Sequence, residues 1–435
     1  MPRGILIAVL IFSVICLVTC SNSTDSQPGG DNDIEVTQAE LAAAESTLTA
    51  VTADFGFQLF HEIAADAQPT ENIFISPLSV LYALVISRNG ASAETEQAFA
   101  ELLGVEGHSN QALNQTMRDI TDQLCNADAG VQFKAANSIW SRAGKGLKPK
   151  FVNICQEYFD AVAREMDFQA PGAAETINNW VAENTNNKIS EIVNGPISPE
   201  IALLLLNAIY FNASWTYPFD TAKIWTEPFY LADGTTTDCE LMWRDSDEDY
   251  WLFDQYNERP IVYFSDGNYY APGTVKGISI PYGSEGFYMT LLMPDSTVTM
   301  EEFMGLLTAE NWKAWQNLPR ENELIMAMPK FKLEYSTGLK TVLAAMGLDI
   351  AFDPDRADFS NMFSDGVGWI DDVKHRTFIQ VDEHGTEAAA DTEVWYADSI
   401  PPIFIADRPF IVVIHEQSTG AILFIGRISN PEWQE

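Results

Sequence analysis

The chain is poor in cysteine, and this shortage excludes two classes of protein. Only 5 of its 435 residues are cysteines. Three of these lie beyond residue 20, at Cys125, Cys155 and Cys239, and an odd count at such wide spacing favours neither a disulfide framework nor a zinc site. We expect these three to be small buried hydrophobic residues.

Basic residues are also scarce. The chain has 24 Lys and Arg against 62 Asp and Glu, a formal net charge of -38. Such a charge disfavours nucleic acids and acidic polysaccharides as partners. The acidic run at 245–249 lacks the glycine and the distal glutamate of a calcium-binding EF-hand loop, so we expect a solvated loop and no metal.

Catalytic signatures are missing as well. There are 5 histidines, and the sequence has no Gly-x-Ser-x-Gly elbow, no His-Glu-x-x-His helix and no phosphate-binding glycine loop. We therefore expect no cofactor and no enzyme activity. A hydrolase whose catalytic residues come from distant positions remains one alternative, because triads can be assembled from residues far apart in the chain.

The only apolar run that precedes the first helix indicates export. Residues 5–18 are apolar except for Ser13 and follow Arg3, which fits a signal peptide and is short for a membrane span. The sequence Leu-Val-Thr that precedes Cys20 resembles a prokaryotic lipobox. This predicts a signal peptide at 1–20 and a lipid at Cys20, with plain secretion as the alternative.

The next segment, residues 21–47, has the composition of a flexible linker that leads into the first helix. Its first half is rich in Ser, Asn, Asp, Gly and Pro. We expect the chain to contact the membrane only through the lipid at Cys20 and to be extracellular or anchored at the cell surface.

Residues 386–396 alternate in the manner of a strand but run into Pro401 and Pro402, which cannot donate to a sheet. One face carries Thr386, Ala388, Ala390, Thr392, Val394 and Tyr396, and the other carries Glu387, Ala389, Asp391, Glu393 and Trp395. The pattern indicates an exposed loop that can become a strand, or simply an edge strand that ends in a Pro-Pro turn.

Several short motifs decide between these readings. In chain order they are Asn72–Ser79 with Gly90 and Ala91, Asn207–Phe211 with Trp215 and Phe219, Pro329–Phe331 with Leu339, Lys340 and Met346–Leu348, Glu383–Ala390, Arg408–Phe410, and Phe424–Pro431. In this order they resemble the signatures of the serpins, from about residue 50 to 432. Ordered matches are far more specific than any single motif.

The resemblance implies an α+β fold: a serpin-like single domain at 48–432 with three β-sheets, about eight to nine helices and an exposed reactive-centre loop at 383–402. It also implies a monomeric suicide-substrate inhibitor that forms a covalent complex with a target serine or cysteine protease. Loop insertion is a known example of strand addition and stored strain. The alternatives are a non-inhibitory serpin-fold binding protein and the hydrolase named above.

The resemblance also assigns residue roles. The hinge comprises Glu383, Gly385, Thr386, Glu387, Ala388, Ala389 and Ala390; the cluster that holds the central strands comprises Ser76, Ser79, Asn207 and His375; and Lys330 pairs with Glu383 as a hinge clamp. The reactive bond is Asp398-Ser399 when counted back from the prolines and Ser399-Ile400 when counted forward from Glu383, with Tyr396-Ala397 as a third option. Asp391 and Glu393 depart from the small residues typical of the hinge, and by alternation we expect them to face solvent after insertion.

Periodicity predicts the main elements. Apolar residues from Leu48 to Ile63 recur at helical spacing, Ser76 and Pro77 form a helix start, and residues 177–193 read as a helix. Residues 201–211 are apolar throughout and fit a buried helix or a central strand, and the family resemblance favours the strand. Further strands are predicted at 288–293, 378–381, 411–415 and 421–428.

Overall fold

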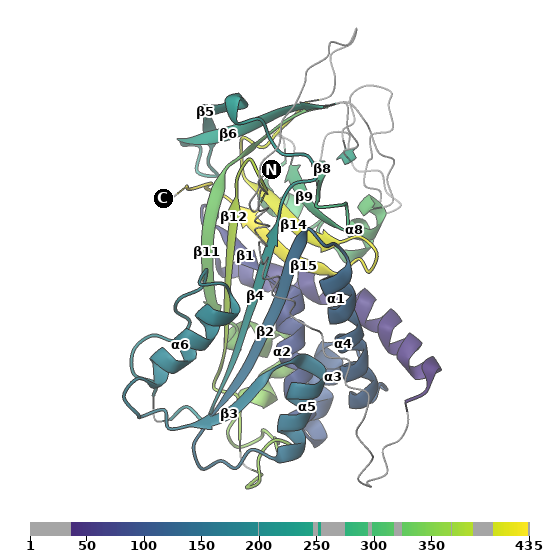
Figure 1. The fold of residues 1–435 in the computed structure, drawn as a ribbon, viewed down its shortest axis with the longest axis vertical. Coiled ribbons are helices and arrows are strands. Elements are labelled where there is room, and N and C mark those ends of the chain that lie inside the picture. Colours follow the sequence, from purple (N-terminus) through teal and green to yellow (C-terminus); the bar gives the residue numbers. More distant parts are fainter. Residues whose placement is uncertain are drawn as a thin grey trace, which may run out of the picture. The chain divides into compact units, whose positions relative to one another are not determined.

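The computed structural model of this protein describes residues 36–198, 200–246, 251–253, 275–294, 298–316, 324–366, 368–385 and 403–433. Residues Thr37–Glu435 form one compact unit. Its described part contains nine α-helices and three β-sheets (Figure 1), which confirms the predicted α+β fold. The helices are α1 (Gln38–Asp66), α2 (Pro77–Gly90), α3 (Ala93–Leu102), α4 (Asn110–Asn126), α5 (Pro149–Phe159), α6 (Ala173–Asn184), α7 (Met300–Met304), α8 (Ala309–Gln316) and α9 (Lys340–Leu343).

The functional argument depends mainly on the five-stranded sheet. Its strands, in spatial order, are β11 (Phe331–Gly338), β12 (Asp372–Val381), β4 (Leu203–Ala213), β2 (Val131–Arg142) and β3 (Val162–Met166). A six-stranded sheet has the order β1 (Ile73–Ile75), β15 (Ile422–Ile428), β14 (Phe410–Glu416), β9 (Phe287–Pro294), β8 (Val275–Tyr282) and β7 (Trp251–Phe253). A four-stranded sheet has the order β13 (Ile403–Ile405), β10 (Leu324–Pro329), β6 (Thr236–Ser246) and β5 (Ile224–Tyr230).

The first helix begins earlier than the apolar periodicity alone indicates. Thr37 and Glu40 form a capping box, in which each side chain accepts a hydrogen bond from the backbone of the other residue. This cap starts α1 at Gln38, inside the segment predicted as linker and helix start. Leu48 and Ile63 are buried, as their spacing predicts.

The predicted start of the second helix is confirmed. Ser76 caps α2 by accepting a hydrogen bond from the backbone of Ser79, and Pro77 occupies the first helical position. Every residue of α2 is buried. The helix therefore runs through the interior, where it contacts β2 and β4 of the five-stranded sheet and β15 of the six-stranded sheet (Figure 1).

The prediction of one helix over 177–193 is wrong at its C-terminal end. Helix α6 stops at Asn184, and Asn186 and Asn187 have φ of 48° and 59°. Such left-handed residues end a helix. The chain then returns along α6, where the Asn178 side chain accepts from the Val193 N–H at 3.0 Å and donates to the Val193 carbonyl at 2.9 Å.

Apart from β12, the predicted strands are confirmed to within two residues at their starts, and the segment predicted at 201–211 forms the strand β4, which begins at Leu203. Strand β12 is longer than predicted, and its burial alternates strictly along its length. One face of the sheet is covered in part by α6 (Figure 1), through an apolar cluster that includes Ile177, Val181, Leu204, Leu206 and Ala208. Phe378 of β12 packs against this cluster.

The cysteines divide into two groups. Cys155 and Cys239 are buried, and burial raises the pKa of both thiols to about 12. Cys125 is exposed, so its predicted burial is wrong. It lies next to buried Leu124 on α4, and consecutive helical residues point in different directions.

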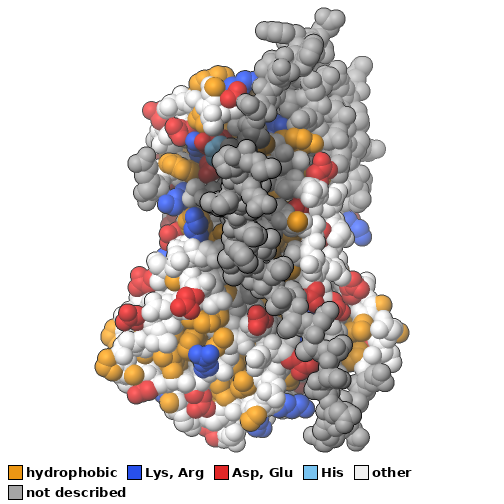
Figure 2. All heavy atoms as spheres, viewed as in Figure 1, with side chains coloured by type: hydrophobic (Ala, Val, Ile, Leu, Met, Phe, Trp, Pro, Cys, Tyr) orange, Lys and Arg blue, Asp and Glu red, His pale blue; other side chains and the backbone are white. Residues whose placement is uncertain are grey.

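No group of three or more His, Cys, Asp or Glu in the described part of the chain is placed to hold a metal ion. Among the same residues, no helix is both long enough and apolar enough to cross a bilayer. Figure 2 shows carboxylate side chains spread over the described surface on the face in view.

Candidate functional site

The five-stranded sheet is only partly paired at its centre. Strands β12 and β4 pair in parallel from Asp372 opposite Leu204 to Arg376 opposite Ala208. Beyond that rung, no register pair joins the described residues 377–381 to 209–213. The outer edges of both strands stay paired, because β11 follows β12 to Val381 and β2 follows β4 to Ala213. Among the described residues, two neighbouring strands thus present unpaired edges to each other, and such edges are a template for an additional strand.

A tight turn follows the open end of β12. The backbones of Asp382 and Gly385 exchange two hydrogen bonds, both 3.2 Å long, around a two-residue turn. The Asp382 carboxylate also accepts from the backbone N–H of His384 at 3.0 Å. This turn directly precedes the segment that begins at Thr386.

Gly385 occupies a position that only glycine can take. Its φ is +106°, and a Cβ there would lie 2.4 Å from the backbone nitrogen of Trp215 and 2.7 Å from the carbonyl oxygen of Ala213. Both the backbone conformation and the close approach of another backbone require the missing side chain. The turn is therefore seated against the segment that follows β4.

Three further hydrogen bonds hold the turn in place. The Trp215 N–H donates to the His384 carbonyl at 3.1 Å, and the Phe219 N–H donates to the Glu383 carbonyl at 2.8 Å. The indole Nε1 of Trp215 donates to the Asp382 carbonyl at 2.9 Å. Trp215 is buried, and its ring stacks on Tyr282 with centroids 4.4 Å apart. The turn is thus anchored on a rigid aromatic base.

An ion pair connects the turn to Lys330, the residue between β10 and β11. The Nζ atom of Lys330 lies 2.6 Å from Oε2 of Glu383, and both side chains are less than a fifth exposed. Burial opposes ionisation of Glu383, but the hydrogen bond and charge of Lys330 outweigh it and hold the carboxyl pKa below its usual value. Lys330 also lies 3.8 Å from Glu240 and over the ring of Trp433, 5.8 Å from its centroid. The two residues of the predicted clamp are therefore in contact.

The four residues of the predicted strand-holding cluster also lie together. Ser76, Ser79, Asn207 and His375 are buried. His375 Nε2 accepts from the Ser76 N–H at 3.0 Å, and Asn207 Nδ2 donates to the Ser79 carbonyl at 2.6 Å. Asn207 and His375 are directly opposite each other, one rung before the β4–β12 pairing ends. The cluster thus connects the start of α2 to both strands where they begin to separate.

Burial also sets the charge of this cluster. Desolvation lowers the pKa of His375 to about 4, so the imidazole is neutral near pH 7 and can accept the hydrogen bond from Ser76. The Ser76 hydroxyl donates in turn to the Leu423 carbonyl of β15 at 2.6 Å. A neutral histidine therefore belongs to a network that joins two sheets.

Three residues that complete this arrangement are absent from the sequence-based prediction. Asn137 of β2 is opposite Asn207 and accepts from its side-chain amide. Thr377, the first residue of β12 beyond the pairing, donates to the Phe74 carbonyl. Trp433 completes the surroundings of Lys330. An asparagine in the middle of a buried strand is an available signal for Asn137, whereas nothing local indicates the other two.

The family can now be assigned. A family model described as serpin (serine protease inhibitor) matches residues 50–431. The chain belongs to the serpin family. An uncharacterized serpin-like protein of Thermococcus kodakarensis is 32% identical over 389 residues, which cover 87% of this chain and 84% of that protein.

Solved serpin structures agree with this fold. The native state of the thermophilic serpin tengpin is 28% identical, with a TM-score of 0.76, and the match covers 94% of this chain and 97% of tengpin. Human thyroxine-binding globulin, solved with thyroxine, has a TM-score of 0.79 at 24% identity, over 90% of this chain and 100% of its own. The second likeness shows the fold alone. Serpins are generally protease inhibitors rather than enzymes.

Part of the predicted serpin site lies outside the described residues. This applies to the hinge from Thr386 to Ala390 and to the reactive-bond candidates Asp398, Ser399 and Ile400. The predicted lipidation site, Cys20, is also outside. The structure describes the chain again at β13, which pairs in parallel with β10. The described part of the site therefore consists of the two strand edges, the turn at 382–385 and the clamp.

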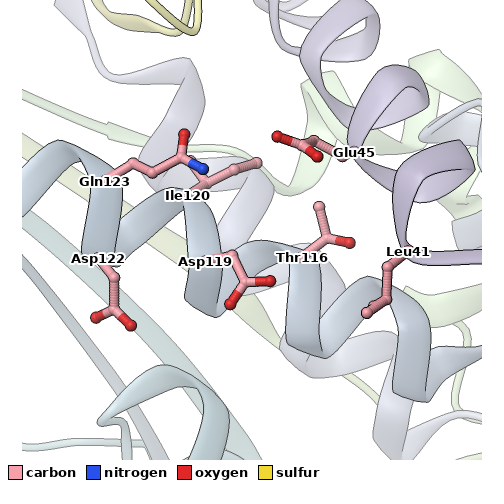
Figure 3. Close-up of a pocket in the computed structure, with 7 residues that line it drawn as sticks. All are labelled: Leu41, Glu45, Thr116, Asp119, Ile120, Asp122 and Gln123. Atoms are coloured by element: carbon pink, nitrogen blue, oxygen red, sulfur yellow. The ribbon is translucent and has the colours of Figure 1, made fainter. Parts of the chain in front are cut away.

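Two cavities in the described part of this serpin lack the arrangement of a hydrolase site. A cavity of about 320 Å³ lies between α1 and α4 (Figure 3), with the carboxylates of Glu45, Asp119 and Asp122 around it. Its lining includes no serine, cysteine or histidine. A second cavity of about 670 Å³ beside α6 includes Ser190 but no histidine. Neither lining therefore holds a nucleophile next to a histidine base.

Proposed function

We propose that this serpin is a suicide-substrate inhibitor of serine endopeptidases, and of cysteine endopeptidases by the same chemistry. The observation that carries the proposal is the pair of unpaired strand edges at 209–213 and 377–381, next to a turn that leads straight into the loop. An inserted strand of about a dozen residues would gain ladder hydrogen bonds on both edges at roughly 1 kcal/mol each, in total on the order of 10 to 20 kcal/mol.

The chemistry begins as ordinary proteolysis. The catalytic hydroxyl or thiol of the protease attacks the carbonyl carbon of the reactive bond, the C–N bond breaks, and the new amino terminus leaves with a proton. The acyl-enzyme that remains is covalently attached to the freed arm of the loop. Insertion of this arm into the sheet then drags the protease away and distorts its active site before water completes the cycle.

Each part of the described site has a role in this cycle. The Lys330–Glu383 pair and the contacts of Trp215 hold the turn in the uncut state. The cluster around His375 and Asn207 keeps β4 and β12 together at 204–208 and 372–376 until the loop enters. The small side chains at the hinge pass between the strands, where a large or charged side chain would be stopped.

The reactive bond is Asp398-Ser399 or Ser399-Ile400. Asp398 on the acyl side suits proteases that cut after aspartate, such as caspases and granzymes. Ser399 on that side suits elastase-like or subtilisin-like proteases. A third option, the Tyr396-Ala397 bond, suits chymotrypsin-like proteases.

The second candidate function is that of a binding protein, which the likeness to thyroxine-binding globulin supports. A serpin of this kind would bind a partner without trapping a protease, and its cut loop would give no adduct. The small residues of the hinge at Thr386, Ala388 and Ala390 favour the inhibitor.

One experiment separates the two functions. The purified protein is incubated with elastase, subtilisin, chymotrypsin and a caspase, and SDS-resistant adducts are sought on denaturing gels. The C-terminal peptide is sequenced to identify the bond. We expect an adduct with at least one protease and none with the Thr386→Arg variant, which blocks entry of the loop. Cleavage of the wild-type protein without any adduct would overturn the inhibitor and leave the binding protein.

Export and lipid attachment at Cys20 are proposals from the sequence, since residues 1–35 lie outside the described part. A lipid there would place a monomeric inhibitor at the membrane surface on a tether. Expression in a bacterium with radiolabelled palmitate tests this. We expect label in the wild-type protein and none in Cys20→Ala, and an unlabelled wild-type protein would indicate plain secretion.

A further inference from the structure

The cavity between α1 and α4 is lined by facing stripes of the two helices. On α1 the stripe consists of Leu41 and Glu45, and on α4 it includes Thr116, Asp119 and Ile120, so that each stripe spans about one turn. Figure 3 shows Glu45 reaching from α1 toward the side chains of α4. The volume of about 320 Å³ lies at the lower end of the range of small-molecule pockets.

Thr116 brings a buried hydroxyl to this cavity. The residue is 2% exposed, and its Oγ1 atom has no hydrogen-bond partner among the described residues. Three other threonines, Thr47, Thr121 and Thr176, donate to the carbonyl four residues earlier at 3.0, 2.8 and 3.0 Å. Figure 3 shows the Thr116 hydroxyl directed toward the α1 side of the cavity instead. Because an unpartnered buried hydroxyl is costly, this orientation points to a polar ligand in the cavity.

The charge of the cavity favours a cation. Its lining includes the carboxylates of Glu45, Asp119 and Asp122. Helix α1 contains no lysine or arginine, and α4 contains only Arg118. No ion pair within the described part of the chain involves any of the three carboxylates. A cation in the cavity would therefore be attracted from both helices, whereas an anion would be repelled.

The lining also indicates which kind of cation fits. The described residues include no group of three or more His, Cys, Asp or Glu that could hold a metal ion, so the three carboxylates do not form a metal site. An ammonium group has three N–H donors and no acceptor, and it can donate to a carboxylate and to a hydroxyl oxygen at once. Leu41 and Ile120 add apolar surface among the charged residues, which suits methylene groups.

We propose that this cavity binds a small linear amine with two ammonium groups, one held by Glu45 of α1 and the other by Asp119 of α4. The Thr116 hydroxyl accepts a hydrogen bond from the second ammonium group, and the methylene chain lies against Leu41 and Ile120. Such a ligand bridges the two helices and binds only the folded chain. The unfolding temperature should therefore rise with the concentration of the amine.

Calorimetric titration with 1,4-diaminobutane tests the site at low ionic strength, because salt screens exposed charges. We expect saturable binding of one diamine per chain. Butylamine, with a single ammonium group, and Mg²⁺, with the same charge but no methylene groups, should bind about threefold more weakly or less. Equal binding of Mg²⁺ would overturn the proposal in favour of attraction to the net charge. Equal binding of butylamine would overturn it in favour of a single ammonium group, such as the lysine side chain of a partner protein.

Neutral variants test the two carboxylate contacts. Glu45→Gln and Asp119→Asn should each weaken binding of 1,4-diaminobutane about two- to fivefold, the usual effect of losing an exposed ion pair. Glu62→Gln is the matched control, since Glu62 is exposed on the same helix as Glu45 but does not line the cavity. Unchanged affinity in the first two variants, or an equal loss in the control, would overturn the assignment.

Thr116→Val distinguishes a ligand contact from a structural role. Valine keeps the shape of threonine but has no hydroxyl, so the variant loses a buried group that has no partner in the free protein. We expect the ligand-free variant to be at least as heat-stable as wild type, and its affinity for 1,4-diaminobutane to fall about threefold. A less stable variant would show that the hydroxyl serves the fold and would overturn its role in binding. None of these measurements involves a protease, so their outcome is independent of the proposed function.

Discussion

The two halves of the β4–β12 interface differ in what holds them. In the half at 372–376, the strands are hydrogen-bonded to each other, connected through His375 and Asn207 to α2, and covered by the apolar cluster beneath α6. In the half at 377–381, the same strands share no register pair with each other; each stays paired on its outer edge, β12 with β11 and β4 with β2, and the seated turn lies beyond them. The two strands are therefore hydrogen-bonded to each other in the first half, whereas in the second half only their outer neighbours and the turn hold them in place.

This difference shows where free energy can be stored in a single fold. Unpaired strand edges are costly, and proteins normally cover or pair them. Here the edges stay separated between an anchored turn and a buried polar cluster. Changes at the turn should therefore release the open half, while changes at the cluster should loosen the paired half.

The largest effect is expected at the seat of the turn. In Gly385→Ala, the new Cβ would press on the backbone of Trp215 and the residue would keep an unfavourable positive φ. We expect the uncut form to lose about 3 kcal/mol or more. Thermal unfolding and the half-life of adduct-forming activity measure this.

Gly420 supplies the control for this change. It also has a positive φ, +69°, but a Cβ added there would meet no other atom within 4 Å. Gly420→Ala should cost about 1 kcal/mol from the backbone alone. Equal losses in the two variants would mean that the turn is not seated tightly.

The second-largest effect is expected from acid, which should destabilise the half of the β4–β12 interface at 372–376. His375 titrates with a pKa of about 4 in the folded protein, below the ordinary 6.5, so the unfolded chain binds the extra proton first. Stability is therefore complete above about pH 6.5 and falls by about 1.4 kcal/mol per pH unit toward pH 4. Buried His415, with a pKa of about 3, adds a similar slope.

Denaturation at pH 7, 6 and 5 measures this dependence. His375→Gln retains an acceptor for the Ser76 N–H and should remove the first of the two slopes. A variant with an unchanged pH dependence would show that His375 does not titrate as its burial requires.

The third-largest effect is expected at the clamp formed by Lys330 and Glu383. In Lys330→Met, Glu383 keeps its position but loses the cation 2.6 Å away. We expect the uncut form to lose about 1 to 3 kcal/mol and to convert faster to an inactive form. Loss of adduct formation during prolonged incubation at a fixed temperature measures the rate. The exposed pair Arg356–Asp349 is the comparison, and Arg356→Ala should leave the rate unchanged.

The smallest effect is expected at Trp433, whose ring lies under the Lys330 ammonium. Trp433→Ala should cost about 0.5 to 1 kcal/mol, the usual value of a cation–π contact at a partly exposed site. The same incubation assay measures it, with Trp225→Ala, another exposed tryptophan, as control. Equal rates of inactivation in both variants would show that the Trp433 ring adds nothing to the stabilisation by the Lys330–Glu383 ion pair.

Local patterns were sufficient for much of the fold. Ser76 and Pro77 mark a helix start through chemistry that acts within one turn, and alternation marks the strands around Ile411 and Ile425. Residues 201–211 are ambiguous because a strand buried on both faces has no alternation. The end of α6 was missed although Asn186 and Asn187 supply a local stop signal, because the apolar spacing continues to Val193 in the returning chain that Asn178 holds against the helix.

The site was predictable only in part. The resemblance pointed to Lys330 and Glu383, and the structure places them in contact. The incomplete ladder could not be predicted, because the partners Leu204 and Asp372 are far apart in the sequence and the end of their pairing depends on tertiary packing.

The central place of β14 determines what a cut molecule would be. This strand follows the reactive loop in the chain, all its residues are buried, and it is hydrogen-bonded on both edges, to β15 and to β9. A break at residues 398–400 would therefore leave two polypeptides that stay together as one particle without a covalent link. Gel filtration in native buffer would not register the event, and only a denaturant would separate the short piece from the long one.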